Sequence, residues 1–161
     1  MLYSKKNIIA QVNLWKKENK DIIFTNGCFD LLHKGHIELL KKAKCYGQIL
    51  IVGLNSDSSV KILKGDKRPI ENQEIRVKNL LKLGIVNAVC IFKEKTPIEL
   101  IKSVRPNFLI KGSDYKKNKV VGSDIIKNWD GEVIIMPLIK GYSTTSIIEK
   151  KKREGLVKLI K

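Results

Sequence analysis

Short apolar runs alternate with helix-like segments from one end of the chain to the other, and this alternation limits the possible folds more than any other feature. The apolar runs cover residues 22–26, 49–54, 88–92, 108–111 and 132–136. Each has the length of a strand buried on both faces. Helical patterns separate the runs, so successive strands are expected to be parallel and joined by right-handed crossovers. We therefore predict an α/β fold, a Rossmann-like open parallel five-stranded sheet with helices on both faces.

The predicted helices carry start and stop signals of their own. Asn72 is suited to capping a helix that stops at Gly84. Thr96, Pro97 and Glu99 form a capping-box pattern for the helix after the third predicted strand. No linker or internal repeat interrupts the series, so residues 1–161 are expected to form a single domain.

The segment between the first predicted strand and the next helix contains the only two histidines of the chain. His33 and His36 are separated by Lys34 and Gly35. A strand end that meets a helix start is where open α/β sheets bind ligands, and the free N–H groups of the helix favour phosphate. Gly35 has no Cβ, so a phosphate chain can lie against the backbone. Because no third or fourth ligand lies at a useful spacing, we expect phosphate rather than zinc at these histidines.

Polar residues that follow other predicted strands are expected to reach the same cleft. Lys111 ends an apolar strand, where an ammonium group needs an anion to offset its desolvation. The Ser-Thr-Thr run at residues 143–145 opens the last predicted helix and offers a second anion site. Lys64 and Arg68 lie in a polar loop that can fold over a phosphate, although a solvated turn is nearly as good an interpretation of either one alone.

Such a set of residues suits attack by a phosphate oxygen on the α-phosphorus of a nucleoside triphosphate. Both reactants are anions, so the protein must hold them together and neutralise charge on the five-coordinate phosphorus. No nucleophilic side chain is needed, because a phosphomonoester oxygen is ionised near neutral pH. Asp30, close to the expected phosphates, can orient Mg²⁺ carried by the nucleotide.

The charge of the chain bears on its partners. The formal net charge is +16, and only four of the 32 basic residues are arginine. The lysines are spread over the predicted helix surfaces, where their field attracts anionic small molecules. Aromatic residues make up 6% of the chain, which leaves little for nucleic-acid readout.

Two further features bear on location. No apolar run approaches the length of a membrane span. Cys28, Cys45 and Cys90 form no Cys-x-x-Cys pair, which is typical of packing in a reducing compartment. We expect a cytoplasmic protein that binds neither nucleic acid nor a membrane.

Together these motifs resemble the cytidylyltransferase-like nucleotidyltransferases, and among them the adenylyltransferases of ADP-heptose synthesis. The resemblance covers about residues 21–150. Over this range the chain is similar to the C-terminal half of a bifunctional heptose kinase/adenylyltransferase. Its most specific parts are Asn26-Gly27-Cys28-Phe29-Asp30, Lys64-Gly65 with Arg68-Pro69, and Lys111-Gly112-Ser113-Asp114-Tyr115. Ser113 and Asn87 depart from the family pattern, which usually has glycine and aspartate there.

The resemblance implies that ATP and D-glycero-β-D-manno-heptose 1-phosphate react to ADP-heptose and pyrophosphate, for lipopolysaccharide core or a related glycan. It implies that His33 and His36 stabilise the transferring α-phosphate and that Lys111 holds a further phosphate. It assigns sugar-phosphate binding to Asn55, Asp57, Lys64 and Arg68. It assigns nucleotide binding to Thr25, Asn26, Gly27, Cys28, Phe29, Asp30, Gly35, Gly112, Asp114, Ser143, Thr144 and Thr145. The sugar 1-phosphate would come from another protein, and a homodimer is expected because dimers are common in this family.

Two other interpretations stay open. Glycerol-3-phosphate cytidylyltransferases and archaeal-type FAD synthetases resemble the chain in the histidine and Ser-Thr-Thr motifs, and residues 111–115 are the reason for ranking the heptose reaction first. A module that binds nucleotide or nucleic acid without turnover is an alternative from another class. The intact set of histidines, Lys111 and residues 143–145 disfavours it.

Overall fold

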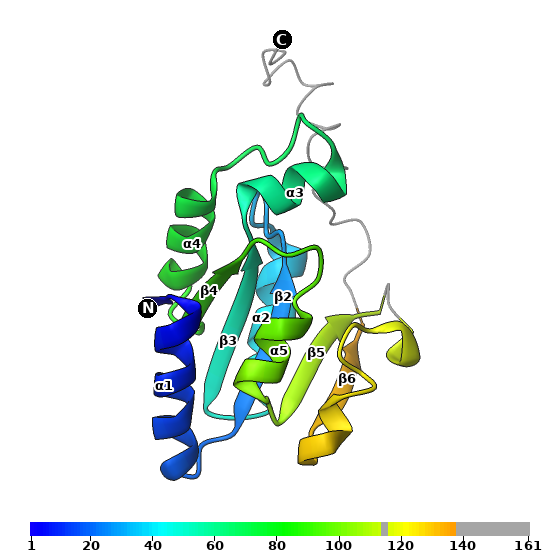
Figure 1. Cartoon of the computed structure of the whole chain (residues 1–161). Helices are drawn as coiled ribbons and strands as arrows, with labels where there is room; N and C mark the ends of the chain where they lie inside the picture. The colour runs from blue at the N-terminus through cyan, green and yellow to red at the C-terminus, as the bar shows by residue number, and fades with distance from the viewer. Residues whose placement is uncertain (114–115, 138–161) are drawn as a thin grey trace.

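The computed structural model of the protein describes residues 1–113 and 116–137, which form a parallel sheet flanked by helices (Figure 1). The strands lie in the order β1-β4-β3-β2-β5-β6, and every neighbouring pair is parallel. The predicted α/β, Rossmann-like class is confirmed. The strands are β1 (Leu2–Tyr3), β2 (Ile22–Gly27), β3 (Ile49–Asn55), β4 (Ala88–Phe92), β5 (Phe108–Gly112) and β6 (Glu132–Met136).

The sheet has six strands among the described residues, so the prediction of five was wrong by one. The additional strand, β1, contains only Leu2 and Tyr3 and pairs with Val89 and Cys90 of β4. The N-terminal ammonium donates to the carbonyl of Asn87, which holds this short segment at the edge. Two residues are too few to show a period, which is why the sequence pattern did not reveal β1.

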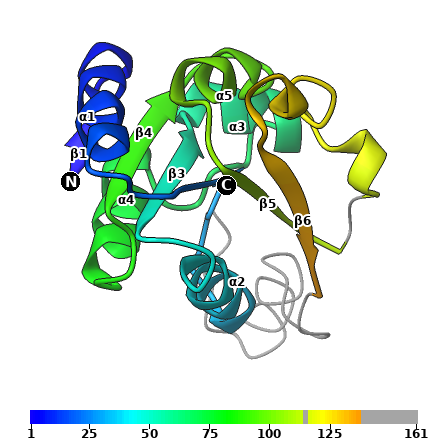
Figure 2. The ribbon, with the colours of Figure 1, turned by 90° about the horizontal axis from the view of Figure 1, so that it is seen from below.

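The helices cover both faces of the sheet, as predicted. Residues of α1 and α5 pack with one face, and residues of α2 and α4 pack with the other. Figure 2 shows α1 and α5 on the side of the sheet opposite to α2. The helical elements are α1 (Lys5–Lys17), α2 (Lys34–Lys44), α3 (Asp57–Lys64), α4 (Gln73–Lys82), α5 (Ile98–Val104), and the 3₁₀ turns η1 (Lys117–Lys119) and η2 (Ile126–Trp129).

The strand order reverses between β2 and β5. From β2 the chain moves outward to β3 and β4, and it then returns to add β5 and β6 on the other side of β2. In doubly wound sheets, the carboxyl edge at such a reversal is the place where the flanking loops separate and leave room for a ligand. The topology therefore puts the ends of β2 and β5 side by side at the natural ligand-binding position.

One of the two predicted helix caps is present. Asn72 accepts a hydrogen bond from the N–H of Ile75 at 2.9 Å and caps α4, and Gly84 beyond that helix has the left-handed φ of 71°. The capping box at Thr96 was a wrong prediction, because α5 begins after Pro97 without a side-chain cap.

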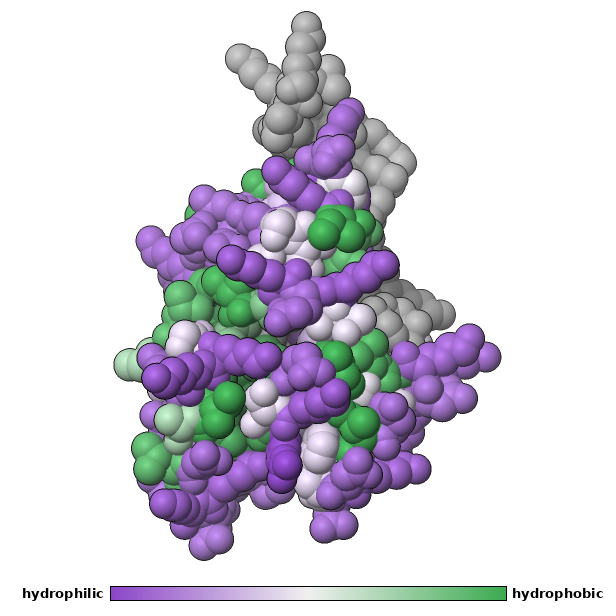
Figure 3. All heavy atoms as spheres, in the orientation of Figure 1, coloured by the Kyte–Doolittle hydropathy of each residue, from purple (hydrophilic) through white to green (hydrophobic). Residues whose placement is uncertain are grey.

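The surface agrees with the spread of lysines along the sequence. Figure 3 shows hydrophilic residues distributed over the face of the molecule that is seen in Figure 1, with apolar patches between them. Across residues 1–113 and 116–137, no helix combines the length and the apolar character needed to span a bilayer.

Candidate active site

The ends of β2 and β5 meet through Lys111. Its ammonium donates to the backbone carbonyl of Asn26 at 2.9 Å, across the point where the strand order reverses. Lys111 is half-buried, and Gly112 behind it is buried. A positive charge therefore stands at the carboxyl edge of the sheet, at the end of β2, and the convergence of Lys111 with the two histidines stays a prediction.

The loop between β2 and α2 is bent by two residues in an unusual backbone conformation. Phe29 and Leu31 have φ values of 46° and 55°, which side chains other than glycine rarely adopt. Each such residue costs on the order of 1 kcal/mol and persists where surrounding contacts fix it. Phe29 is buried, and its ring lies 5.1 Å from the His36 ring, between centroids. The strained loop thus delivers Asp30 and the histidine motif in a fixed arrangement.

The two imidazoles are stacked on each other. Their centroids are 3.7 Å apart and their planes differ by 21°. His33 is also the N-cap of α2, since its Nδ1 accepts the His36 N–H at 3.4 Å. A neutral imidazole with an accepting Nδ1 carries its proton on Nε2. His33 therefore keeps an N–H donor available on the other side of its ring.

Both histidines are neutral near pH 7. Burial, and after it the adjacent His33, lower the pKa of His36 to about 3, and burial lowers the pKa of His33 as well. Stacked rings at this distance do not accommodate two positive charges. The pair is thus suited to donating directional hydrogen bonds to a phosphate rather than to supplying net charge.

Three buried polar atoms of β2 and α2 have no hydrogen-bond partner within the part of the chain that the structure describes. They are Thr25 Oγ1, Asn26 Oδ1 and His36 Nδ1. An unsatisfied buried polar atom is unfavourable, and each of the three marks a place where a ligand or water group can supply the missing partner. His36 Nδ1 is one such atom within the histidine motif, and the binding of a molecule by residues 25–36 stays a prediction.

Asp30 holds the loop of residues 65–72 against this segment. Its carboxylate accepts from Arg68 Nε at 2.6 Å and from the N–H groups of Ile70 and Glu71 at 2.9 to 3.0 Å. Asp30 is 1% exposed. The loop that carries Arg68 is thereby brought over the histidine segment, whereas Lys64, at the end of α3, is exposed to solvent.

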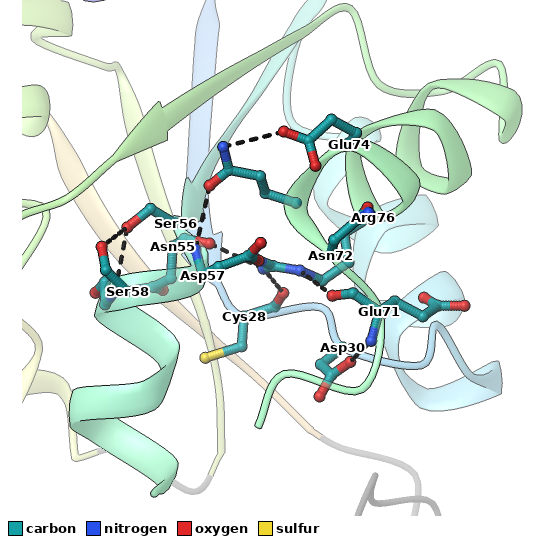
Figure 4. Close-up of polar contacts among 12 residues, drawn as sticks. Cys28, Asp30, Asn55, Ser56, Asp57, Ser58, Glu71, Asn72, Glu74 and Arg76 are labelled. Carbon is teal, nitrogen blue, oxygen red and sulfur yellow. Dashed lines mark hydrogen bonds and ion pairs between the residues drawn. The ribbon is translucent and has the colours of Figure 1, made fainter. Parts of the chain in front are cut away.

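Sequence reasoning missed Arg76, a fully buried residue of α4. Its guanidinium donates to the carbonyls of Cys28, Asn55 and Glu71 at 2.6 to 3.0 Å, and it pairs with Asp57 at 2.7 Å (Figure 4). These groups come from the ends of β2 and β3 and from the starts of α3 and α4. A signal existed in the sequence, because Arg76 stands four positions before Leu80 and so shares the helix face that packs on the sheet.

The structure engages Asn55 and Asp57 in contacts within the fold. Asn55 is 4% exposed and donates to Ser59 Oγ, and Asp57 pairs with Arg76. Their expected contact with the sugar phosphate stays a prediction. Cys28 is half-buried, and burial raises the pKa of its thiol, so it is not a ready nucleophile. Gly35 is buried in the first turn of α2.

Four predicted nucleotide-binding residues, Asp114 and the run Ser143, Thr144 and Thr145, lie outside the described residues. Within residues 1–113 and 116–137, no group of three His, Cys, Asp or Glu side chains can hold a metal ion. Asp30, the predicted metal residue, does not fit that role. Its oxygens already accept from a guanidinium and two N–H groups.

A search of protein families found that residues 24–154 match the cytidylyltransferase-like family model. The chain belongs to this family. It is 46% identical over 147 residues to the bifunctional protein HldE of Koribacter versatilis, and 54% identical over 136 residues to that of Helicobacter pylori strain P12. These alignments cover 91% and 84% of the chain but only 30% and 29% of the relatives. The chain therefore spans less than a third of the length of the curated relatives.

Solved structures show the same fold. A lipopolysaccharide core biosynthesis protein from Thermoplasma volcanium superposes with a TM-score of 0.59 at 26% identity, covering 77% of this chain and 99% of that one. A pantoate-β-alanine ligase from Francisella tularensis gives a TM-score of 0.64 at 18% identity, covering 94% and 77%, which is a likeness of fold alone. In the cytidylyltransferase-like family, a nucleotide accompanied by a divalent metal is the usual substrate.

Replacing Arg76 tests its role in joining the carboxyl edge. Arg76→Met leaves the carbonyls of Cys28, Asn55 and Glu71 without their donor, so we expect a loss of about 3 to 5 kcal/mol in the free energy of unfolding. Arg76→Lys keeps the positive charge but not the planar guanidinium fork, and its free energy of unfolding should fall by less. Urea denaturation measures both. A methionine variant within about 1 kcal/mol of the native protein contradicts this role.

Acid stability tests the environment of His36. The unfolded imidazole takes up a proton below its ordinary pKa of 6.5, whereas the folded one does so only near 3. The native protein therefore loses stability as the pH falls from 6.5 toward 3, by up to about 1.4 kcal/mol per pH unit for this one group. In His36→Asn that contribution disappears, so the variant's stability should fall less steeply in this range. Urea denaturation from pH 7 to 4 gives both slopes, and equal slopes contradict the interpretation.

Proposed function

We propose that the protein is an adenylyltransferase that joins ATP and D-glycero-β-D-manno-heptose 1-phosphate to give ADP-heptose and pyrophosphate. The observation that carries the proposal is the stacked His33–His36 pair at the start of α2, which follows β2, together with the Lys111 ammonium that reaches the end of β2 at the β2–β5 junction. The similarity to bifunctional HldE proteins supports the choice of substrates. The product is a precursor for lipopolysaccharide core or a related glycan.

In the proposed reaction, an ionised oxygen of the sugar phosphate attacks the α-phosphorus of ATP. A new P–O bond forms, the bond between the α-phosphorus and the α,β-bridging oxygen breaks, and pyrophosphate leaves with that electron pair. His33 and His36 donate hydrogen bonds to the α-phosphate as negative charge builds on its oxygens. Lys111 neutralises a further phosphate, and no side chain becomes covalently modified.

Other residues hold the two anions in place. Lys64 and Arg68 bind sugar-phosphate or triphosphate oxygens, and Gly112 and residues 25–29 line the nucleotide. Asp114 and residues 143–145 complete the triphosphate site. We propose Mg²⁺ as the cation that accompanies ATP, where it offsets phosphate charge. We also propose that the protein is a homodimer and that it is located in the cytoplasm, where ATP and the sugar phosphate are both accessible.

The nucleotide and the acceptor can be tested together. With heptose 1-phosphate, ATP should exceed CTP by at least about tenfold in kcat/KM, a difference of about 1.4 kcal/mol in transition-state binding. Pyrophosphate release is the readout, with glycerol 3-phosphate and FMN as competing acceptors. Higher efficiency with CTP and glycerol 3-phosphate, or with ATP and FMN, identifies a different nucleotidyltransferase. Retention of RNA at moderate salt without any pyrophosphate release identifies a binding module.

The charge of Lys111 is tested by Lys111→Met, which keeps the aliphatic stem. Because the ammonium acts on phosphate charge, we expect turnover to fall about a hundredfold or more while the fold survives. Lys127→Met, at an exposed position of η2, is the matched control and should keep native turnover. Thermal melting excludes unfolding. Near-native kinetics in Lys111→Met would assign Lys111 to ordinary solvation at a strand end.

A further inference from the structure

Both carboxylate oxygens of Asp30 accept hydrogen bonds from the protein itself. Oδ1 accepts the N–H groups of Ile70 and Glu71, each at 3.0 Å. Oδ2 lies 2.6 Å from Arg68 Nε and 2.5 Å from Arg68 Nη2. A magnesium ion requires oxygen ligands at about 2.1 Å with near-octahedral room for water. A buried carboxylate that faces a guanidinium offers no such room.

We propose that Asp30 is a positioning residue that orients Arg68 toward the phosphates of the substrates, and that it does not bind the metal of the nucleotide. The inference rests on the proposed function, because it concerns how that site holds its anions. It replaces the metal role that the sequence suggested for Asp30.

The geometry of the pair explains how orientation is achieved. Arg68 uses one edge of its planar fork, Nε and Nη2, on Asp30, and its side chain is 14% exposed. A planar guanidinium fixed at one edge presents its other donors in a set direction. Since Asp30 offsets its charge, Arg68 contributes a directed hydrogen bond, in contrast to the exposed ammonium of Lys64.

Asp30 also fixes the loop on which Arg68 is carried. The N–H of Glu71 donates to Asp30, while the carbonyl of Glu71 accepts from Arg76. Figure 4 shows Glu71 between these two residues. The loop is therefore held through both the N–H and the carbonyl of Glu71. The loss of Asp30 should release the Arg68 guanidinium and the backbone N–H groups of Ile70 and Glu71.

Kinetics separate positioning from metal binding. In Asp30→Asn we expect kcat/KM for the sugar phosphate to fall by about tenfold or more, since small displacements of a phosphate donor carry large kinetic penalties. The Mg²⁺ concentration for half-maximal rate should stay unchanged. Asp66→Asn, which removes an exposed carboxylate from the same loop, is the matched control and should keep native kinetics.

Coupling to Arg68 is the decisive kinetic comparison. If Asp30 acts through Arg68, the double variant Asp30→Asn/Arg68→Gln should be no slower than the worse single variant by more than about threefold. Multiplicative losses, together with a higher Mg²⁺ requirement in Asp30→Asn, overturn the proposal.

Amide hydrogen exchange tests the contacts without any turnover. In the nucleotide-free protein, the amides of Ile70 and Glu71 should be protected in the native chain, equally protected in millimolar Mg²⁺, and unprotected in Asp30→Asn. Loss of protection on adding Mg²⁺ to the native chain overturns the proposal. If the native chain releases no pyrophosphate with any acceptor, the proposed function fails, and the exchange result still decides what Asp30 holds.

Discussion

The guanidinium of Arg76 is a full positive charge without solvent contact, and its burial constrains everything around it. Removing such a group from water is expensive unless its donors are met, and here three backbone carbonyls and Asp57 meet them. Those acceptors belong to different loops that all start at the carboxyl edge of the sheet. The requirement to satisfy one buried cation therefore fixes where the loops after β2 and β3 run, and where α4 begins.

Asp30 is the matching buried anion of this edge, and it satisfies Arg68 as Asp57 satisfies Arg76. The two pairs fix the loops, and the proposed ligand then meets the imidazoles, Lys111, Lys64 and the oriented guanidinium of Arg68. Because the imidazoles are neutral and stacked, they are suited to donating directional hydrogen bonds and not to supplying net charge. The ammonium groups of Lys111 and Lys64 supply charge. That division suits a reaction between two anions, in which positioning and charge neutralisation must both be provided.

Much of the fold was predictable because its strands are continuous apolar runs separated by helical patterns. The exception, β1, has two residues and no period. Asn72 was predictable as a cap because its contact to Ile75 is local, whereas Thr96 has the right type and spacing but the backbone begins the helix after Pro97.

In the candidate site, too, the local features could be predicted from the sequence and the contacts between distant residues could not. The His-x-Gly-His segment is local and could be recognised, although the stacking of the rings and the capping role of His33 depend on the bend at Phe29 and Leu31. Spacing does not show that Asp30 meets Arg68 from 38 positions away. The sequence therefore suggested a metal role for Asp30, a carboxylate whose partner in the structure is Arg68.

The central claim is that the two imidazoles act on the α-phosphate as its charge develops, and turnover compared with ATP affinity tests it most directly. His33→Asn and His36→Asn should each lower the rate of pyrophosphate release steeply, while the calorimetric Kd for ATP changes only a few-fold. The double variant should lose less than the product of the two single losses, since both rings serve one group. Native turnover in both single variants, with ATP bound normally and melting unchanged, would contradict the account.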